Sequence, residues 1–517
     1  MSRRATLVVT WLTLLGCAAG GASTMLPAGT AAGGGEARAA AWFQANRDRP
    51  PLLRMFLQEM PKGGDIHTHL SGAVYAESYL EWAAELGLCV DLGTSTIVSP
   101  PCQPEARRPS VREVLGNAGV YSALVDGLST RNLANQRQSG HNQFFGTFDR
   151  FGAISGLRHP EMVAELVSRA ADQHVSYVEM MLTLRGAEAR RLGREVGFDG
   201  DLAATFARLR DPAAGLAALV QAGVADLGAL ERSVDSRLGC AGSPLPAPCR
   251  VTRRYLQASS RVLEPGEVFA QLVYAFELAQ AEPRVVGVNL LAPEDDLVAR
   301  RDYRLHMRMV GWLAARYPEV KIALHAGELQ LGLVPPEDLR FHIREAVEIG
   351  KARRIGHGVD IAHERDAMQL LAMLKDRDVL VEICLTSNDV ILGVRGRSHP
   401  LATYLRAGVP VTLATDDEGV SRIDLTHEYV RAAREHGLGY RDLKRLARRS
   451  LSYSFAGGPS LWREGTTSDV VAPCAGGPPG GDLSPACRAF LDQSEKARLQ
   501  WDLERAFTEF EAHLWLR

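Results

Sequence analysis

The chain has 517 residues, of which 59 are Lys or Arg and 61 are Asp or Glu, so its formal net charge is −2. This balance excludes the strongly basic composition that is typical of nucleic-acid-binding proteins. With 46% hydrophobic residues, the chain can bury a large core, and its length suits one domain with insertions or two domains.

The first residues have the pattern of an export signal. Arg3 and Arg4 precede an apolar run that is too short to span a bilayer as a helix. The run ends in Leu-Leu-Gly-Cys, which predicts a lipoprotein-type signal over residues 1–17 with a lipid anchor at Cys17; ordinary cleavage just beyond is the alternative. The Ala/Gly-rich residues 18–40 are expected to form a flexible tether. We therefore expect an exported protein of the periplasm or cell envelope that meets a membrane only through this anchor.

The cysteines also favour export. Six of them form close pairs along the chain, each around a loop that contains Pro or Gly: Cys89/Cys102, Cys240/Cys249 and Cys474/Cys487. Short loops of this kind suit disulfides in an oxidising compartment, and six reduced structural thiols are the alternative. Cys384 lies in an apolar run and is expected to be a buried small hydrophobe.

Eight apolar runs predict strands, and helical patterns separate several of them. The expected strands are Gly64–Leu70, Val175–Leu184, Arg254–Val262, Arg284–Leu291, Lys321–His325, Arg353–His357, Val379–Thr386 and Val409–Thr415. Strands that alternate with helices indicate a parallel sheet, and eight such units fit an α/β fold of the (β/α)8 TIM-barrel type.

Residues 41–517 are therefore expected to form a single barrel domain. Residues 41–62 predict an N-terminal helical segment, and the tail from about residue 425 predicts a helical C-terminal extension. Residues 71–174 and 185–253 are too long for simple connections, so they are expected to be insertions, either near the mouth of the barrel or as stabilising appendages.

Two histidines end the first expected strand. His67 and His69 are two residues apart, so on a strand both imidazoles point to the same face. Neutral imidazoles are natural zinc ligands. On its own, such a pair is equally compatible with a structural role.

Two later strands end in similar groups. His325 closes an apolar run and is followed by Gly327 and Glu328; His357 stands between two glycines at the end of another run. A glutamate in a partly desolvated site can stay protonated near neutral pH and deliver its proton. A core histidine and an ordinary strand-end charge are the alternative interpretations.

Asp416 and Asp417 end the last expected strand. Adjacent carboxylates at the end of an apolar strand are costly unless a metal, a substrate or hydrogen-bond donors accompany them. The four groups of polar residues all lie at carboxyl ends of expected strands, which meet at the active-site rim of a barrel. Together they predict an open metal site with its own acid/base, and hence a hydrolase.

The four motifs, in this order, resemble the adenosine deaminase family of the amidohydrolase superfamily over about residues 60–455. The motifs are His67-Thr-His69, His325-Ala-Gly-Glu328, Arg354-Ile-Gly-His357-Gly and Thr415-Asp416-Asp417. Residues 61–65 (Pro-Lys-Gly-Gly-Asp) and 141–151, with four phenylalanines, are most similar to the exported, growth-factor-related branch. Those phenylalanines either pack in the core or form a wall of the base site.

The resemblance implies a fold, a metal and a role for each residue. One Zn²⁺ per chain is implied to be held by four residues and a water: His67, His69, His325 and Asp416. Glu328 is implied to protonate the purine ring, His357 to hold and help deprotonate the water, and Asp417 to bond the five-membered ring. The implied reaction converts adenosine or 2′-deoxyadenosine to the inosine product and ammonia, so the implied partner is a purine nucleoside.

Two positions depart from the family pattern. Ala292 stands where a glycine N–H commonly meets the purine, and Ser71 stands where many members have an aspartate that contacts the sugar. Both are kept as substrate-binding residues, and both put the identity of the substrate in question.

Two other functions remain open. One is a different mononuclear amidohydrolase, acting on another purine or an amide. A dinuclear site is disfavoured because dinuclear members generally need a bridging carboxylated lysine, and no lysine lies in Arg284–Leu291. The other is a purine-binding envelope lipoprotein without catalysis. A cytidine-type deaminase is disfavoured because its Pro-Cys-x-x-Cys signature is absent. Nothing in the sequence specifies an oligomeric state.

Overall fold

The computed structural model describes residues 33–135 and 138–513, and an eight-stranded parallel sheet is its centre. The strands follow each other around the sheet in the order β1 (Gly63–His69), β4 (Val175–Leu182), β5 (Thr252–Ser260), β6 (Val285–Leu291), β7 (Lys321–Ala326), β8 (Arg354–His357), β9 (Leu380–Ile383) and β10 (Val411–Leu413). The predicted TIM-like barrel and its eight strands are confirmed. The last two strands are shorter than expected, and β9 ends just before Leu385, which begins a helix.

The sheet is nearly closed by the chain that follows its last strand. Thr68 of β1 forms a parallel bridge with Asp416. The N–H of His69 donates to the carbonyl of Asp416, and the N–H of Asp416 donates to the carbonyl of His67, both at 2.9 Å. The barrel seam therefore lies at two of the predicted site residues.

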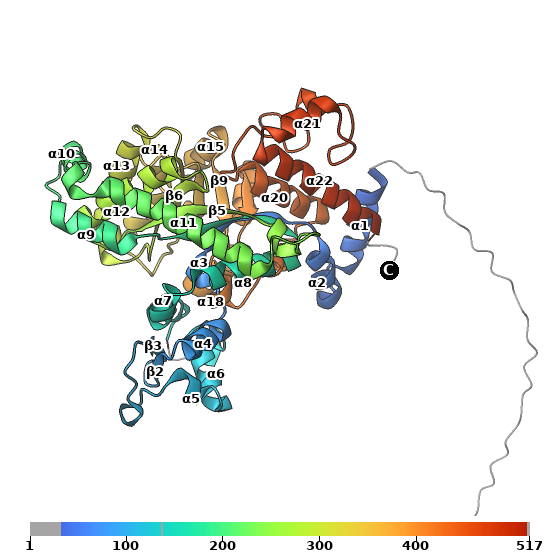
Figure 1. The fold of residues 1–517 in the computed structure, drawn as a ribbon. Helices are drawn as coiled ribbons and strands as arrows, with labels where there is room; N and C mark the ends of the chain where they lie inside the picture. The colour runs from blue at the N-terminus through green and yellow to red at the C-terminus, as the bar shows by residue number, and fades with distance from the viewer. Residues whose placement is uncertain (1–32, 136–137, 514–517) are drawn as a thin grey trace, which may run out of the picture.

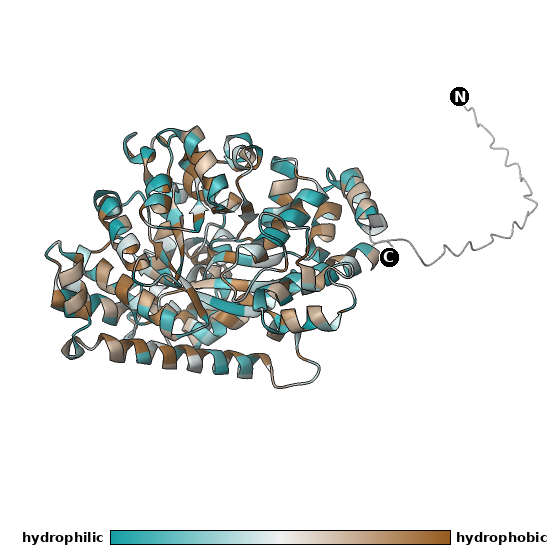
Figure 2. Cartoon of the chain, turned by 90° about the horizontal axis from the view of Figure 1, so that it is seen from above, coloured by the Kyte–Doolittle hydropathy of each residue, from teal (hydrophilic) through white to brown (hydrophobic). Residues whose placement is uncertain are grey.

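Helices surround the sheet in βα alternation (Figure 1). They include α12 (Pro265–Ala281), α13 (Leu297–Ala314), α14 (His342–Glu348), α15 (Ala367–Asp376), α16 (Leu385–Leu392), α17 (Leu401–Ala407), α18 (Glu418–Ser421), α19 (Leu425–Glu435) and α20 (Tyr440–Ser452). In Figure 2, hydrophobic and hydrophilic residues alternate along the peripheral helices, as expected for helices with one face on the core.

The first insertion lies between β1 and β4 and projects from the barrel (Figure 1). Its described residues form a two-stranded hairpin and six α-helices, in the order α3 (Leu70–Ala73), α4 (Ala76–Glu85), β2 (Cys89–Asp91), β3 (Thr96–Val98), α5 (Val111–Val114), α6 (Ala118–Gly127), α7 (Gly140–Ser155) and α8 (His159–Asp172). Phe144 and Phe151 of α7 are buried in the main core, and Phe151 stacks on Tyr79. These rings pack in the core, which was one of their two expected roles.

The second insertion follows β4 and covers the outside of the barrel. Its helices are α9 (Gly186–Val196), α10 (Leu202–Leu209) and α11 (Leu216–Leu238). Helix α9 packs on α12, and α11 packs on α8 and α12. This insertion is therefore an appendage to the outer helices.

Helices at both ends of the chain pack together. They are α1 (Gly33–Asn46), α2 (Pro50–Glu59), α21 (Pro485–Asp492) and α22 (Glu495–His513). The tether expected over 18–40 is wrong for residues 33–40, because α1 begins at Gly33 and buries Ala39 completely. The alanines of this segment favour a helix once α20 and α22 offer a surface. The expected signal at 1–17, with Cys17, lies outside the described residues.

All three expected cysteine pairings are present as disulfides: Cys89–Cys102, Cys240–Cys249 and Cys474–Cys487. Cys384 is free and buried. Within the described ranges, the structure contains no helix with the length and apolar character needed to cross a membrane.

Candidate active site

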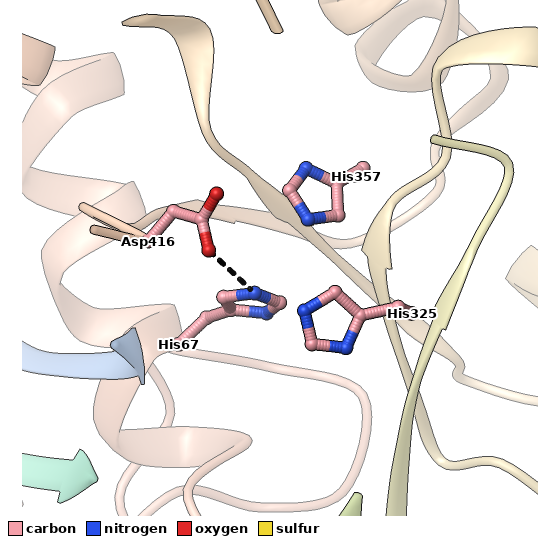
Figure 3. Close-up of side chains that lie close together, drawn as sticks. All are labelled: His67, His325, His357 and Asp416. Atoms are coloured by element: carbon pink, nitrogen blue, oxygen red, sulfur yellow. Dashed lines mark ion pairs between the residues drawn. The ribbon is translucent and has the colours of Figure 1, made fainter. Parts of the chain in front are cut away.

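The predicted site residues converge at the carboxyl end of the barrel. One ligand atom from each of His67, His325, His357 and Asp416 lies within 4.8 Å of the others, and all four residues are buried (Figure 3). They come from four different strand ends, so the chain brings them together only through closure of the barrel.

His69 adds a further imidazole to this cluster. Its Nε2 lies 3.1 Å from Nε2 of His325 and 3.2 Å from Oδ1 of Asp416. The Nε2 of His67 lies 3.4 Å from the same carboxylate oxygen. The set of three imidazoles and one carboxylate whose ligand atoms all lie within 4.8 Å contains His357, whereas His69 groups within that distance with Asp416 and Asp417.

Irregular backbone aims these side chains. The pairing of β1 with β4 shifts register between Asp65 and Thr68, so the strand carries one extra residue beside His67. His357 and Asp416 have φ angles of 69° and 61°. Non-glycine residues rarely adopt such angles, and they concentrate at functional sites where the surrounding structure enforces them.

His67, His325 and Asp416 each have an outer hydrogen-bond partner that was not predicted from the sequence. Nδ1 of His67 lies 2.6 Å from Oε2 of Glu382, and Oδ2 of Asp416 accepts from Ser387 Oγ at 2.6 Å. Nδ1 of His325 lies 2.8 Å from Oδ1 of Asn289. Partners of this kind orient metal ligands and leave the opposite atom free for the ion. A charge within the apolar run Val379–Thr386 was the available signal for Glu382.

Glu382 belongs to a charged chain inside the barrel. The fully buried Arg354 pairs with Glu382 through Nε and with Glu179 through Nη2, each at 2.7 Å. Tyr177 donates to Glu179 at 2.7 Å. Because Arg354 pairs with both carboxylates, Glu382 can stay ionised beside His67.

The electrostatics of the cluster favour a bound cation. Burial lowers the pKa of His67, but its contacts with Asp416 and Glu382 outweigh this effect and raise the pKa to about 10. Burial raises the pKa of Asp416, yet its contacts with the imidazoles of His67 and His69 hold it well below its usual value. Burial and the neighbouring imidazoles lower the pKa of His325 well below the usual value, so this ring is a neutral lone-pair donor.

Glu328 has the character of a protonated acid. Burial and the nearby Asp416 raise the pKa of its carboxyl well above the usual value. Its Oε1 is buried without a hydrogen-bond partner among the described residues and lies 3.6 Å from Nδ1 of His357. Glu294 fixes the turn by accepting from the N–H groups of Gly327 at 3.0 Å and Glu328 at 2.8 Å. This role of Glu294 was not predicted from the sequence.

Asp417 is a second buried carboxyl at the cluster, beside Asp416. Burial and Asp416 raise the pKa of its carboxyl well above the usual value, and its buried Oδ1 has no partner within the part of the chain described. A Cβ on Gly72 would come within 1.6 Å of that oxygen. Helix α3 therefore needs glycine at this position for Asp417 to keep its place.

A cavity of about 160 Å³ opens beside the cluster. Its lining includes His69, Ser71, Ser155, His159 and Thr183, together with methionine and leucine side chains. Ala292 lies near this region at the end of β6 but is not among the lining residues; its φ is 90° and its carbonyl accepts from Arg261 at 2.9 Å. The structure therefore places Ser71 at the cavity and gives Ala292 a backbone conformation that suits glycine.

The donor set suits one transition-metal ion. The buried Nε2 atom of His67 has no hydrogen-bond partner among the described residues, although it faces Asp416. Three imidazole nitrogens and one carboxylate oxygen form a ligand set typical of catalytic zinc sites and other borderline metals. Without an ion this collection of orphaned polar atoms would be costly to bury.

Comparisons with known proteins agree with this geometry. Residues 219–461 match the family model described as adenosine deaminase. An adenosine deaminase of Yersinia pseudotuberculosis is 37% identical over 142 residues, which are 27% of this chain and 39% of the relative. The aminodeoxyfutalosine deaminase of Streptomyces coelicolor is 42% identical over 114 residues, 22% of this chain and 29% of the relative. The chain thus spans about two fifths or less of the length of these relatives.

Solved structures of low sequence identity share the fold. Arabidopsis ADAL complexed with GMP is 23% identical, with a TM-score of 0.50 over 78% of this chain and 94% of that one. The same protein complexed with IMP is 22% identical, with a TM-score of 0.50 over 77% and 93%. Over residues 219–461 the chain is thus similar to the adenosine deaminase family, and the buried cluster of imidazoles and carboxylate agrees with that similarity.

Proposed function

We propose that the protein catalyses the metal-dependent hydrolytic deamination of a purine, with adenosine and 2′-deoxyadenosine as its substrates. The observation that carries the proposal is the position of Glu328. A buried carboxyl with a raised pKa lies beside a cluster that suits a metal ion. A proton donor next to a hydrolytic metal site is the pair of groups that replacement of an amino group by water requires.

In this proposal one zinc ion is held by His67, His69, His325 and Asp416, and its chemistry is to lower the pKa of a coordinated water to about 7. Glu328 donates a proton to the ring nitrogen beside the amino-bearing carbon, which makes that carbon electrophilic. His357 holds the attacking oxygen. Asp417, protonated through burial, offers a hydrogen bond to the five-membered ring.

The choice of purine rests on the relatives and the cavity. The Yersinia relative is named an adenosine deaminase, and the Streptomyces relative is named an aminodeoxyfutalosine deaminase. The hydroxyls of Ser71, Ser155 and Thr183 line the cavity beside the cluster, and hydroxyl groups suit the hydroxyls of a sugar. A different aminopurine is the second candidate, favoured by Ser71 and Ala292, which depart from the family pattern.

We further propose that the protein is exported and anchored by lipid at Cys17. The three disulfides support an oxidising compartment. Membership of the exported, growth-factor-related branch is part of the same proposal and rests on the motifs at 61–65 and 141–151.

The test is an ammonia-release screen of the purified mature protein against adenosine, 2′-deoxyadenosine, adenine and adenosine monophosphate, with and without a chelator. We expect release from the two nucleosides, loss of activity on chelation, and recovery when zinc is added. No release from any aminopurine would contradict the proposal.

Glu328→Gln separates catalysis from binding. The amide cannot donate the carboxyl proton, so we expect kcat to fall by about 100-fold or more while the purine still binds. The control is Glu319→Gln, which changes an exposed glutamate remote from the cluster. Unchanged turnover in Glu328→Gln would refute the assignment of the proton donor.

A further inference from the structure

A chain of hydrogen bonds leads from the backbone to the imidazole of His357. Asn388 Nδ2 lies 2.9 Å from Nδ1 of His357, and Asn388 Oδ1 lies 3.0 Å from Nε2 of His399. The N–H of Leu401 donates to Nδ1 of His399 at 3.2 Å. His399 and Asn388 are both buried, so water does not replace these contacts.

The direction of every bond follows from the backbone donor. Because Nδ1 of His399 accepts from the N–H of Leu401, this nitrogen carries no proton, and the single ring proton must lie on Nε2. That proton is donated to Oδ1 of Asn388, so the amide of Asn388 cannot be flipped. Its Nδ2 then donates to Nδ1 of His357, and the ring proton of His357 must lie on Nε2.

His67 has the opposite arrangement. Its Nδ1 lies 2.6 Å from Oε2 of Glu382, so Nδ1–H donates a hydrogen bond to this carboxylate and Nε2 is the atom whose lone pair can bind a metal. The Nε2 of His357 is buried, lies within the cluster and has no partner among the described residues. The two imidazoles therefore present opposite groups to the same space: a lone pair from His67 and an N–H from His357.

From this geometry we infer that Asn388 and His399 are positioning residues that fix His357 in its Nε2–H tautomer. His357 is then a hydrogen-bond donor to the attacking oxygen and cannot use Nε2 as a metal ligand. This leaves His69, whose Nε2 lies 3.1 Å from Nε2 of His325 and 3.2 Å from Oδ1 of Asp416, as the third imidazole ligand beside His67 and His325. The inference rests on the proposed function for its catalytic consequence, but the tautomer itself depends only on the hydrogen bonds.

An isosteric pair of variants tests the inference away from the cluster. In His399→Gln the amide keeps a donor for Asn388. In His399→Glu the carboxylate is an acceptor, which favours the flipped amide of Asn388 and so moves the proton of His357 to Nδ1. We expect His399→Gln to keep most of kcat and His399→Glu to lose about 100-fold or more, the scale of a lost proton-transfer arrangement, with KM changed only a few-fold.

Two further readouts accompany the kinetics. The zinc content should stay at one per chain in both variants, since neither touches a ligand. In wild-type protein with ¹⁵N-labelled histidine rings, the NMR signals that disappear in His357→Gln should show the proton on Nε2.

Equal kcat in the Gln and Glu variants at equal zinc content, or a His357 proton on Nδ1 in the wild type, would overturn the inference. If His399→Glu does not fold, the wild-type spectrum decides. If the wild type deaminates no aminopurine while the spectrum shows the Nε2–H tautomer, the proposed function fails and the positioning role stands.

Discussion

At the residue scale, the site depends on backbone that few residues tolerate. His357, Asp416 and Ala292 all have positive φ angles, and a non-glycine residue in such a conformation costs roughly 1–2 kcal/mol. The first two belong to the buried cluster. The sequence shows which residue types are present at strand ends, but it does not reveal which of them adopt this conformation.

A glycine behind the cluster gives the first prediction at this scale. A Cβ on Gly356 would lie 2.5 Å from Cε1 and 2.9 Å from Nδ1 of His67. Because His67 is fully buried, it has no space to retreat, so we expect Gly356→Ala to lose most of its bound zinc as measured by elemental analysis.

Gly152→Ala is the matched control for that substitution. Gly152 is exposed in helix α7, and a Cβ there meets nothing within 4 Å. Alanine should stabilise this helix by about 0.5–1 kcal/mol and leave the zinc content unchanged. Full zinc occupancy in Gly356→Ala would show that His67 is not held as described.

At the element scale, closure of the barrel positions the metal ligands. Strand β1 meets the chain after β10 through the bridge between Thr68 and Asp416. Beside it, the buried Oδ2 of Asp65 accepts from Thr415 Oγ1 at 2.6 Å. His67 and Asp416 therefore keep their spacing only while this seam is closed.

Thr415→Val tests the seam. It leaves a buried carboxyl without its strongest donor, which should cost about 1–3 kcal/mol and weaken zinc binding as the strands separate. Thr412→Val is the comparison, because Thr412 Oγ1 makes a longer, 3.3 Å bond to Leu446 and does not cross the seam. Urea unfolding and chelator competition measure both effects; equal zinc affinity in the two variants would contradict the role of the seam.

The sequence predicted the elements better than their contacts. The eight apolar runs predicted all eight barrel strands. The close spacing of the cysteines along the chain predicted all three disulfides. The β2–β3 hairpin was missed, since its strands are only three residues each. Glu382, Asn289 and Asn388 were missed because their roles depend on partners in distant strands, which one sequence does not specify.

At the scale of the whole molecule, buried carboxyls couple stability to pH. Burial raises the pKa of Glu364 to about 7, although its carboxylate accepts from the N–H groups of Ile343 at 2.6 Å and Arg344 at 3.2 Å. An unfolded glutamate has the model value of 4.5, so the folded protein binds this proton more tightly than the unfolded chain does. The resulting stability is fully present below pH 4.5 and is lost as the pH rises through about 7.

Glu364→Gln should reduce this dependence. The amide oxygen still accepts from α14, and no proton is lost between pH 5 and 8. We expect the Tm of the wild type to fall more steeply over this range than that of the variant, with an upper limit of about 3 kcal/mol for the difference. Calorimetry at several pH values measures this difference, with the exposed Glu319→Gln as the control. Identical slopes of Tm against pH in the wild type and in Glu364→Gln would show that Glu364 does not cause the pH dependence.

The whole molecule also explains why the four motifs are informative together although each is ambiguous alone. Each motif alone was equally compatible with a structural histidine or an ordinary strand-end charge and with a metal site. The fold brings them to one rim, where His67, His325, His357 and Asp416 lie within 4.8 Å of one another.

A crystal structure of the zinc-loaded protein, with an anomalous difference map recorded at the zinc absorption edge, examines the metal site directly. We predict one peak per chain, about 2.0–2.2 Å from the ligand atoms of His67, His69, His325 and Asp416, with His357 outside the coordination shell. A map without a peak at this rim, or with a peak bound by His357 in place of His69, would contradict the account.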